Sequence, residues 1–253
     1  MNDKQLLISS IVLLFLMLWL PIGQHDFLID HWMKIGAYAI PFLGIGIFAF
    51  KGKVIDLPPT SNLRFMAVVL LIAYILHQFE EHWIDIFGNY YAFYAFNNNF
   101  ILDSLGQPDA LVRPLSKESI FVINTSLVWL VGLLAVLQSP KRVFPLVAMA
   151  SIVLINGIVH IVAAIPKLQY NPGLLTSLVL FIPLYFWFTR YIRHIGNYKV
   201  LIICGLIWGF LAHVIMVAGL LLANWFEMIP EHLYWFVLVA WSFVPVQILR
   251  RTT

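Results

Sequence analysis

The chain contains a series of apolar runs, each long enough to cross a lipid bilayer as a helix. A helix needs about 20 predominantly apolar residues to span a hydrocarbon core of about 30 Å. Of the 253 residues, 62% are hydrophobic and 11% are charged, and the mean hydropathy is +0.90. These values predict an all-α, polytopic membrane helical bundle. They leave little chain for a soluble domain, so we expect a single transmembrane domain over residues 1–253.

Eight segments are expected to span the membrane. In order, they are Gln5–Ile22, Ile35–Phe50, Arg64–Phe87, Glu118–Gln138, Val143–Ile165, Pro172–Tyr191, Tyr198–Trp225 and Glu231–Leu249. The first could be a signal peptide, but no small-residue cleavage pattern follows it, which favours a retained helix. The loop from Gly88 to Lys117 is long enough to form a lid or an interfacial helix.

The basic residues predict the orientation of the bundle. With eight spans, both termini lie on one side of the membrane. That side carries Lys4, Lys51, Lys53, Arg64, Lys141, Arg142, Arg190, Arg193, Lys199, Arg250 and Arg251, and the opposite side carries Lys34, Arg113, Lys117 and Lys167. The positive-inside rule therefore predicts cytoplasmic termini. Because these basic residues lie in short loops, the isoelectric point near 9.0 does not indicate a nucleic-acid partner.

Two adjacent carboxylates, Glu80 and Glu81, lie at the end of the third expected span. A charged residue at the centre of a membrane helix costs about 2.5–3.5 kcal/mol on insertion scales, and two close carboxylates resist joint ionisation. His77 shares their helix face, because residues three and four apart are neighbours. His82 points away from His77 and is a weaker candidate. The Glu pair needs a compensating proton or metal, since no Lys or Arg falls within a span at this depth.

Other polar residues are expected at the same depth in the outer leaflet, counted at about 1.5 Å per helical residue. They are Asn124, His160, Thr176 and His213. Each also has an ordinary structural explanation: His160 could pair with Asn156 between helices, and His213 could be a hydrogen-bonded bundle histidine. The single cysteine, Cys204, excludes a cysteine-rich metal site.

Three ordered motifs resemble those of the HXXEE-domain family of bacterial integral membrane proteins. They are His77-x-x-Glu80-Glu81, Asn156-x-x-x-His160 and Pro172-Gly173-x-x-Thr176, and the resemblance covers about residues 65–190. It implies a membrane protein of the bacterial inner membrane that is suspected to be a metal-binding enzyme, with no secure substrate.

The donor atoms favour a hydrolytic metal site. Zinc in such a site takes about three protein ligands and leaves one position open. His77, Glu81 and His160 form such a set, His213 is a further candidate ligand, and Glu80 would be the general base. The arrangement resembles the inverzincin pattern H-x-x-E-H, except that Glu81 stands where that pattern has His. We therefore expect a divalent metal, with zinc favoured over iron or manganese.

The start of the sixth span has two interpretations. Asn171 followed by Pro172 is a strong helix start. The positive end of that helix could also stabilise an oxyanion, with Thr176 nearby and Asn156 as a further catalytic candidate.

The sequence thus predicts a metal-dependent membrane hydrolase that acts on a lipid or a membrane peptide at the exoplasmic side. The alternatives are a proton- or metal-coupled carrier, a metal-free glutamate-dependent hydrolase resembling CAAX-type proteases, and a di-iron oxidase. A carrier is less favoured because no repeat relates the two halves. A di-iron site needs about four carboxylates, and a non-catalytic scaffold would leave the Glu pair unexplained. The sequence does not indicate an oligomeric state.

Overall fold

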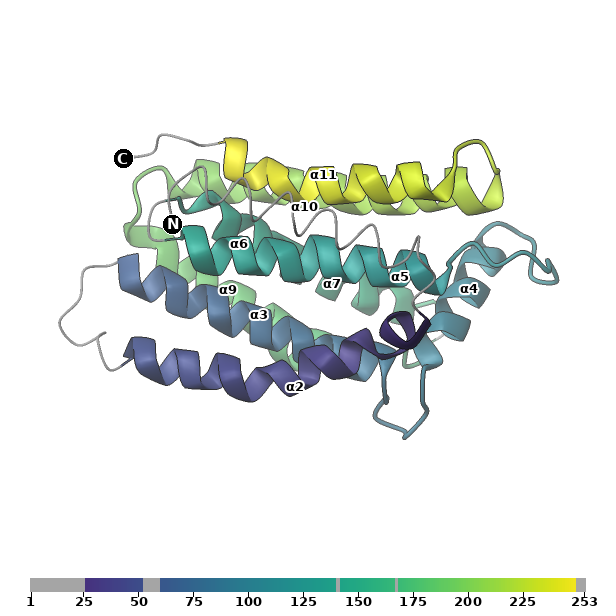
Figure 1. Ribbon diagram of the computed structural model, residues 1–253, viewed down its shortest axis with the longest axis horizontal. Coiled ribbons are helices and arrows are strands. Elements are labelled where there is room, and N and C mark those ends of the chain that lie inside the picture. Colours follow the sequence, from purple (N-terminus) through teal and green to yellow (C-terminus); the bar gives the residue numbers. More distant parts are fainter. Residues whose placement is uncertain (1–25, 52–59, 140–141, 167, 249–253) are drawn as a thin grey trace.

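The computed structural model describes residues 26–51, 60–139, 142–166 and 168–248, and these residues form a bundle of long helices (Figure 1). No strand occurs within these four ranges; one isolated bridge pairs Ile84 with Tyr90. The all-helical fold class is therefore confirmed. The expected first span, Gln5–Ile22, and both chain termini lie outside the described residues.

The helices follow the expected spans closely. They are α2 (Asp26–Lys51), α3 (Thr60–His82), α4 (Ala92–Ser104), α5 (Lys117–Ile123), η1 (Asn124–Leu130), α6 (Val131–Gln138), α7 (Phe144–Ala164), α8 (Leu174–Thr176), η2 (Ser177–Phe181), α9 (Ile182–Tyr191), η3 (Ile192–His194), α10 (Tyr198–Leu220), η4 (Leu221–Trp225) and α11 (Glu231–Ile248). The segments η1, η2 and η4 are π-helical and continue the helices beside them without a break, whereas η3 is a short 3₁₀ turn.

Five helices are long and apolar enough to cross a membrane, as expected of an integral membrane protein. They are Leu63–His82, Lys117–Gln138, Phe144–Ala164, Leu174–Tyr191 and Tyr198–Trp225. Helices α2 and α11 fall outside this set, although both were expected to span. In the described part of the chain, length and composition thus support these five spans, and the expected total of eight stays a prediction.

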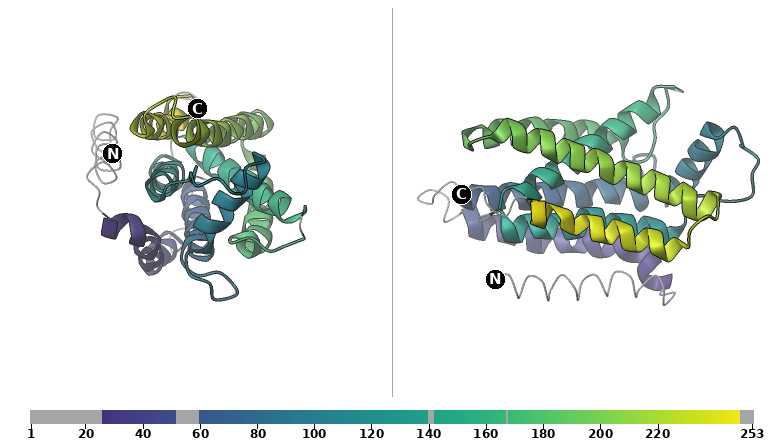
Figure 2. Two further views of the ribbon diagram at one scale, coloured as in Figure 1. Left: turned by 90° about the vertical axis from the view of Figure 1, so that its right-hand side faces the viewer. Right: turned by 90° about the horizontal axis from the view of Figure 1, so that it is seen from above.

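Helix α7 lies at the centre of the bundle. It packs against α3, α6, α9, α10 and α11, and its first ten residues, Phe144 to Val153, are all buried. Glycines on α10 allow the closest approach: a Cβ on Gly205 or Gly209 would meet Ser151 of α7 at 2.8 or 3.2 Å. Helix α2 packs on the outer side of α3, as the end-on view in Figure 2 shows.

The third expected span, Arg64–Phe87, is too long at its C-terminal end. Helix α3 stops at His82, and the chain then forms a tight turn. Asp85 stabilises this turn: its Oδ1 accepts hydrogen bonds from the backbone amides of Phe87 and Asn89, each at 2.9 Å. A carboxylate so placed competes with helical hydrogen bonding, which explains why the helix ends early.

The loop after this turn contains a helix, as the interfacial interpretation expected. Helix α4 lies at one end of the bundle, beside the end of α3 (Figures 1 and 2). Buried Asn98 on α4 holds the following loop: its Oδ1 accepts from Leu115 N at 2.9 Å and its Nδ2 donates to Leu115 O at 3.1 Å. Whether α4 lies at the membrane interface stays a prediction.

Candidate metal centre

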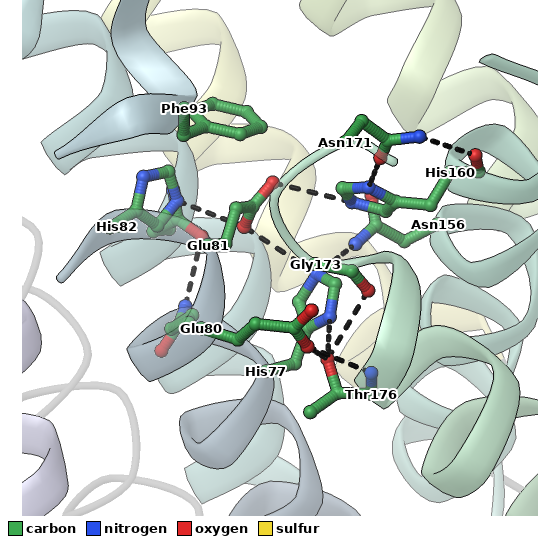
Figure 3. A network of polar contacts seen from close by, with 12 residues as sticks. His77, Glu80, Glu81, His82, Phe93, Asn156, His160, Asn171, Gly173 and Thr176 are labelled. Carbon is green, nitrogen blue, oxygen red and sulfur yellow. Dashed lines mark hydrogen bonds and ion pairs between the residues drawn. The ribbon is translucent and has the colours of Figure 1, made fainter. Parts of the chain in front are cut away.

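Residues of α3, α7 and the α8 turn meet near the α4 end of the bundle (Figure 3). The structure brings together Glu80, Glu81, His77, Asn156, His160 and Thr176 in one polar network. The sequence placed His77, His160 and Thr176 in one layer with Asn124 and His213, and the network joins the first three of these residues. They come from segments up to 99 residues apart in the chain.

Glu80 is held at the start of the helix that begins at Leu174. Its Oε1 accepts hydrogen bonds from Leu175 N at 3.0 Å and from Tyr170 Oη at 2.9 Å. Its Oε2 accepts from Thr176 N at 2.8 Å and from the Thr176 hydroxyl. A carboxylate is stabilised at the first turn of a helix, where backbone N–H groups lack partners. The charge of Glu80 is therefore compensated by these four donors.

Tyr170 completes this set of donors from the loop before the helix. Burial, followed by the nearby Glu80 carboxylate, raises the pKa of the Tyr170 phenol. The phenol therefore stays protonated at neutral pH and keeps donating its hydrogen bond to Glu80.

A hydrogen bond with Thr176 sets the tautomer of His77. The Thr176 hydroxyl has one proton, which it donates to Glu80, so its oxygen accepts from His77 Nδ1 at 2.8 Å. A neutral imidazole with a proton on Nδ1 has a lone pair on Nε2. That Nε2 lies 3.0 Å from Asn156 Nδ2 and 3.5 Å from Glu81 Oε2. Glu80, Thr176 and His77 thus form a carboxylate–hydroxyl–imidazole chain like those that orient metal-binding histidines.

Asn171 fixes His160 in the same tautomer. The Asn171 amide nitrogen donates to the backbone carbonyl of His160 at 2.9 Å, which sets the orientation of the amide. Its Oδ1 then accepts from His160 Nδ1 at 2.6 Å. In the neutral imidazole, the lone pair on His160 Nε2 then faces Glu81 Oε1, at 3.3 Å.

Glu81 faces the Nε2 atoms of both imidazoles, and His77 Nε2 also accepts a hydrogen bond from Asn156 Nδ2 at 3.0 Å. An imidazole lone pair and a carboxylate oxygen repel each other unless a proton or a metal ion lies between them. Ligand atoms of His77, Glu81 and His160 all lie within 4.8 Å of one another, and the three residues are buried. Ligands about 2.0–2.1 Å from a tetrahedral zinc ion are about 3.3 Å apart. The donor atoms of these three residues therefore fit a divalent metal.

Gly173 closes one side of this group (Figure 3). Its φ of +96° is a backbone conformation that favours glycine. A Cβ at this position would come 2.7 Å from Cε1 of both His77 and His160. The helix begins at Leu174 with Gly173 as its N-cap, so the expected start, with Asn171 as the cap and Pro172 at the first helical position, is wrong by two residues. Gly173 lets the backbone lie directly against both imidazoles.

His82 contacts Glu81 although its helical phase separates it from His77. Its Nε2 lies 2.9 Å from Glu81 Oε2, and its ring packs against Phe93 and Trp32 with centroids 4.4 and 5.1 Å apart. Sequence reasoning missed this contact because adjacent helical residues diverge by about 100°. The position of His82 at the last residue of α3 was the available signal, since the side chain of a terminal residue is less constrained by the helix.

A chain of side-chain hydrogen bonds leads from Trp129 to His82. Trp129 Nε1 donates to Gln78 Oε1 at 2.8 Å, and Gln78 Nε2 donates to Asn124 Oδ1 at 2.9 Å. Asn124 Nδ2 then lies 3.2 Å from His82 Nε2. Asn124 belongs to the same region of the bundle, as the depth argument expected, but it reaches Glu81 only through His82.

His213 lies apart from the group of three donor residues. Its Nδ1 donates to the carbonyl of Gly209 on its own helix at 2.8 Å, which is the ordinary structural explanation given above. It lines a cavity of about 350 Å³ that also reaches Glu81 and Asn156. His213 is therefore not part of the group of donors that lie together, and its expected role as a metal ligand is not tested by the structure.

The family comparison covers the part of the chain that builds this centre. A family model described as "Protein of unknown function with HXXEE motif" matches residues 68–188. This range contains all three motifs that the sequence singled out. Comparison with curated proteins and with solved structures finds no match. Residues 68–188 thus match the HXXEE family model, and the resemblance drawn from the motifs is confirmed.

Proposed function

We propose that the protein is a metal-dependent membrane enzyme, a hydrolase, whose metal is held by His77, Glu81 and His160. The observation that carries the proposal is the convergence of two imidazole Nε2 lone pairs on the Glu81 carboxylate, at 3.5 and 3.3 Å. Two neutral imidazoles and one carboxylate form a donor set that zinc takes in hydrolases, with one position left open. A bound zinc ion would polarise a carbonyl or phosphoryl group and activate water.

The residues around the metal ligands have distinct roles in this proposal. Glu80 was expected to be the general base, but its four hydrogen-bond donors favour a positioning role, in which it holds His77 through Thr176. Asn156 lies beside His77 Nε2 and lines the cavity. Its amide is placed to donate to an oxygen of the substrate as negative charge develops there.

Water would reach the centre from the side of His82. A second cavity, of about 330 Å³, is lined by His82, Phe93, Asp30 and Lys117 among others. The Asp30 and Lys117 side chains form an ion pair at 2.8 Å within it. His82 lines this cavity and contacts Glu81 Oε2 at 2.9 Å, which supports a route for water to the carboxylate along His82.

The substrate in this proposal is a lipid or a membrane peptide, and the centre lies on the exoplasmic side. The basic residues support this orientation through the positive-inside rule. An apolar cavity beside the centre supports a substrate that comes from the membrane.

A metal-free glutamate-dependent hydrolase is the second candidate. It is favoured by the 2.9 Å contact between His82 Nε2 and Glu81 Oε2, because a proton on His82 can satisfy one carboxylate oxygen without a metal. Glu81 would then activate water itself.

One experiment separates these candidates. The purified chain is incubated with a panel of long-chain esters, phospholipids and transmembrane peptides, with and without a chelator, and product release is followed by mass spectrometry. The proposal predicts turnover that the chelator abolishes and zinc restores. Turnover that ignores the chelator would establish the metal-free mechanism instead, and proton or metal flux without turnover in proteoliposomes would establish a carrier.

A further inference from the structure

The cavity of about 350 Å³ next to the metal centre, which we call the apolar cavity, is enclosed by parts of α3, α4, α5, α7, α10, η1 and η4. Its volume lies in the range of about 300–1,000 Å³ that is usual for small-molecule sites. Most of the residues that line it are aliphatic or aromatic, including Phe100, Ile152 and Leu220. Glu81 and Asn156 lie in its wall, so the cavity leads directly to the centre.

The cavity lies where helices α7 and α10 are further apart than at their point of contact. Nearer their inner ends they touch, since Gly205 and Gly209 of α10 lie against Ser151 of α7. One to two turns further along, Asn156 and Val159 of α7 and His213 and Val217 of α10 all line the cavity. Gly205, Gly209 and Ser151 thus allow the two helices to touch. Further along, larger side chains keep the helices apart, and the cavity lies between them.

The cavity opens toward the membrane. Three apolar residues in its wall, Phe100, Val159 and Val217, have exposed fractions of 39%, 48% and 53%. Val159 and Val217 belong to helices long and apolar enough to cross a membrane, so these exposed side chains meet lipid. A molecule can therefore enter sideways from the bilayer between α7 and α10.

The polar groups of the apolar cavity are unevenly available to a ligand. Asn97 and Ser104 of α4 donate to carbonyls of their own helix, and Asn124 is engaged with Gln78 and Ile120. By contrast, His213 donates through Nδ1, which leaves the Nε2 lone pair as an acceptor. Asn156 and Glu81 belong to the metal centre. The available polar atoms thus lie at the end of the cavity near the centre.

We propose that the apolar cavity binds a single acyl chain, and that the substrate of the metal centre is therefore a lipid-like amphiphile that enters sideways between α7 and α10. This inference rests on the proposed function. The chain would lie along the apolar wall, with its polar group at Glu81, Asn156 and His213. An extended peptide fits this wall less well, because each of its residues brings an N–H and a C=O that need partners.

The test is cross-linking by a photoreactive fatty acid, with matched valine-to-tryptophan variants on the same two helices. Val159→Trp and Val217→Trp fill the cavity wall. Val162→Trp and Val214→Trp are the controls, because these valines are exposed to 56% and 44% but do not line the cavity. The probe is a long-chain fatty acid with a diazirine on the chain, added to the full chain in detergent, and labelled peptides are identified by mass spectrometry.

The proposal expects labels on peptides of α4, α7 and α10 that line the cavity. Labelling should fall about tenfold in the two wall variants and should be unchanged in the controls. The tryptophan takes the space of about two methylenes of the chain, and the free energy of burying two methylenes corresponds to about a tenfold change in affinity. Equal labelling of all four variants, or labels confined to the outer faces of the helices, would overturn it. Metal content, measured on the same samples, separates the two proposals: cavity labelling in a protein that takes up no metal would refute the metal centre and leave the acyl-chain site standing.

Discussion

Asn171 and His160 are joined by two hydrogen bonds, one from the imidazole Nδ1 to Asn171 Oδ1 at 2.6 Å and one from the Asn171 amide to the His160 carbonyl at 2.9 Å. The second bond sets which amide atom of Asn171 is the oxygen that faces the imidazole. That oxygen is an acceptor, so the imidazole proton lies on Nδ1. The Nε2 lone pair of His160 is directed at Glu81 as a result. Asn171 is therefore a positioning residue for the metal centre.

The variant Asn171→Leu should weaken metal binding by about 10–100-fold, which is the usual cost of losing the partner of a metal-binding histidine. The measurement is zinc affinity by competition with a chelator of known affinity. Asn224→Leu is the matched control, because Asn224 also donates to a backbone carbonyl, that of Pro114 at 2.9 Å, in a different part of the bundle. Equal loss of affinity in both variants would indicate general damage to the fold.

Gly173→Ala should abolish metal binding, because the new Cβ would press on both imidazoles at 2.7 Å. Gly88→Ala provides a control for backbone strain. Gly88 has a φ of +83°, similar to the +96° of Gly173, but a Cβ there would meet nothing within 4 Å. Both variants should lose about 1–2 kcal/mol of stability from the positive φ, and only Gly173→Ala should lose the metal. Normal zinc binding by Gly173→Ala would show that the backbone does not constrain the two histidines.

The two glutamates should respond differently to the same substitution. Glu80→Gln places an amide nitrogen among four donors, which should lower the free energy of unfolding by about 1–3 kcal/mol, while most of the metal is retained. Glu81→Gln should lose the metal, because an amide is a poorer ligand than a carboxylate. Thermal unfolding and metal analysis of both variants provide the comparison. Full metal retention in Glu81→Gln would remove Glu81 from the ligand set.

Reporter fusions test the orientation on which an exoplasmic site depends. A reporter fused after Thr253 should be cytoplasmic, and one inserted between Asn97 and Asp109, in α4 and the loop after it, should be exoplasmic. The reason is the concentration of Lys and Arg on the side of the termini. An exoplasmic report from Thr253 would contradict the span count and the predicted side of the metal centre.

Much of the fold could be read from the sequence, because apolar runs of membrane length predict helices without knowledge of their partners. The helix α7 was expected at Val143–Ile165 and is found at Phe144–Ala164. The end of α3 was missed, because it depends on a tight turn that Asp85 stabilises. Side-chain hydrogen bonds of this kind are set by a few atoms and leave no periodic signal.

Some of the residues that meet could be predicted, but His82 was missed as a contact of Glu81 and His213, expected in the same layer, lies apart. Helix periodicity grouped His77 with Glu80 and Glu81, and depth added His160 and Thr176. The contacts of Glu80 with the backbone of Leu175 and Thr176 could not be foreseen, because they depend on how the helix starting at Leu174 is placed against α3. The contacts of Glu231, whose Oε1 accepts from Ser116, Ser119 and Asn224, could not be foreseen for the same reason.

The most direct test of the central claim is the metal content of the purified full chain and of four histidine variants. The account predicts one tightly held divalent metal in the natural protein. It also predicts that His77→Ala and His160→Ala lose the metal, while His213→Ala keeps it because His213 lies outside the group of three donors, and His82→Ala keeps most of it. A natural protein without metal after zinc loading, or equal loss in all four variants, would contradict the assignment of His77, Glu81 and His160 as ligands.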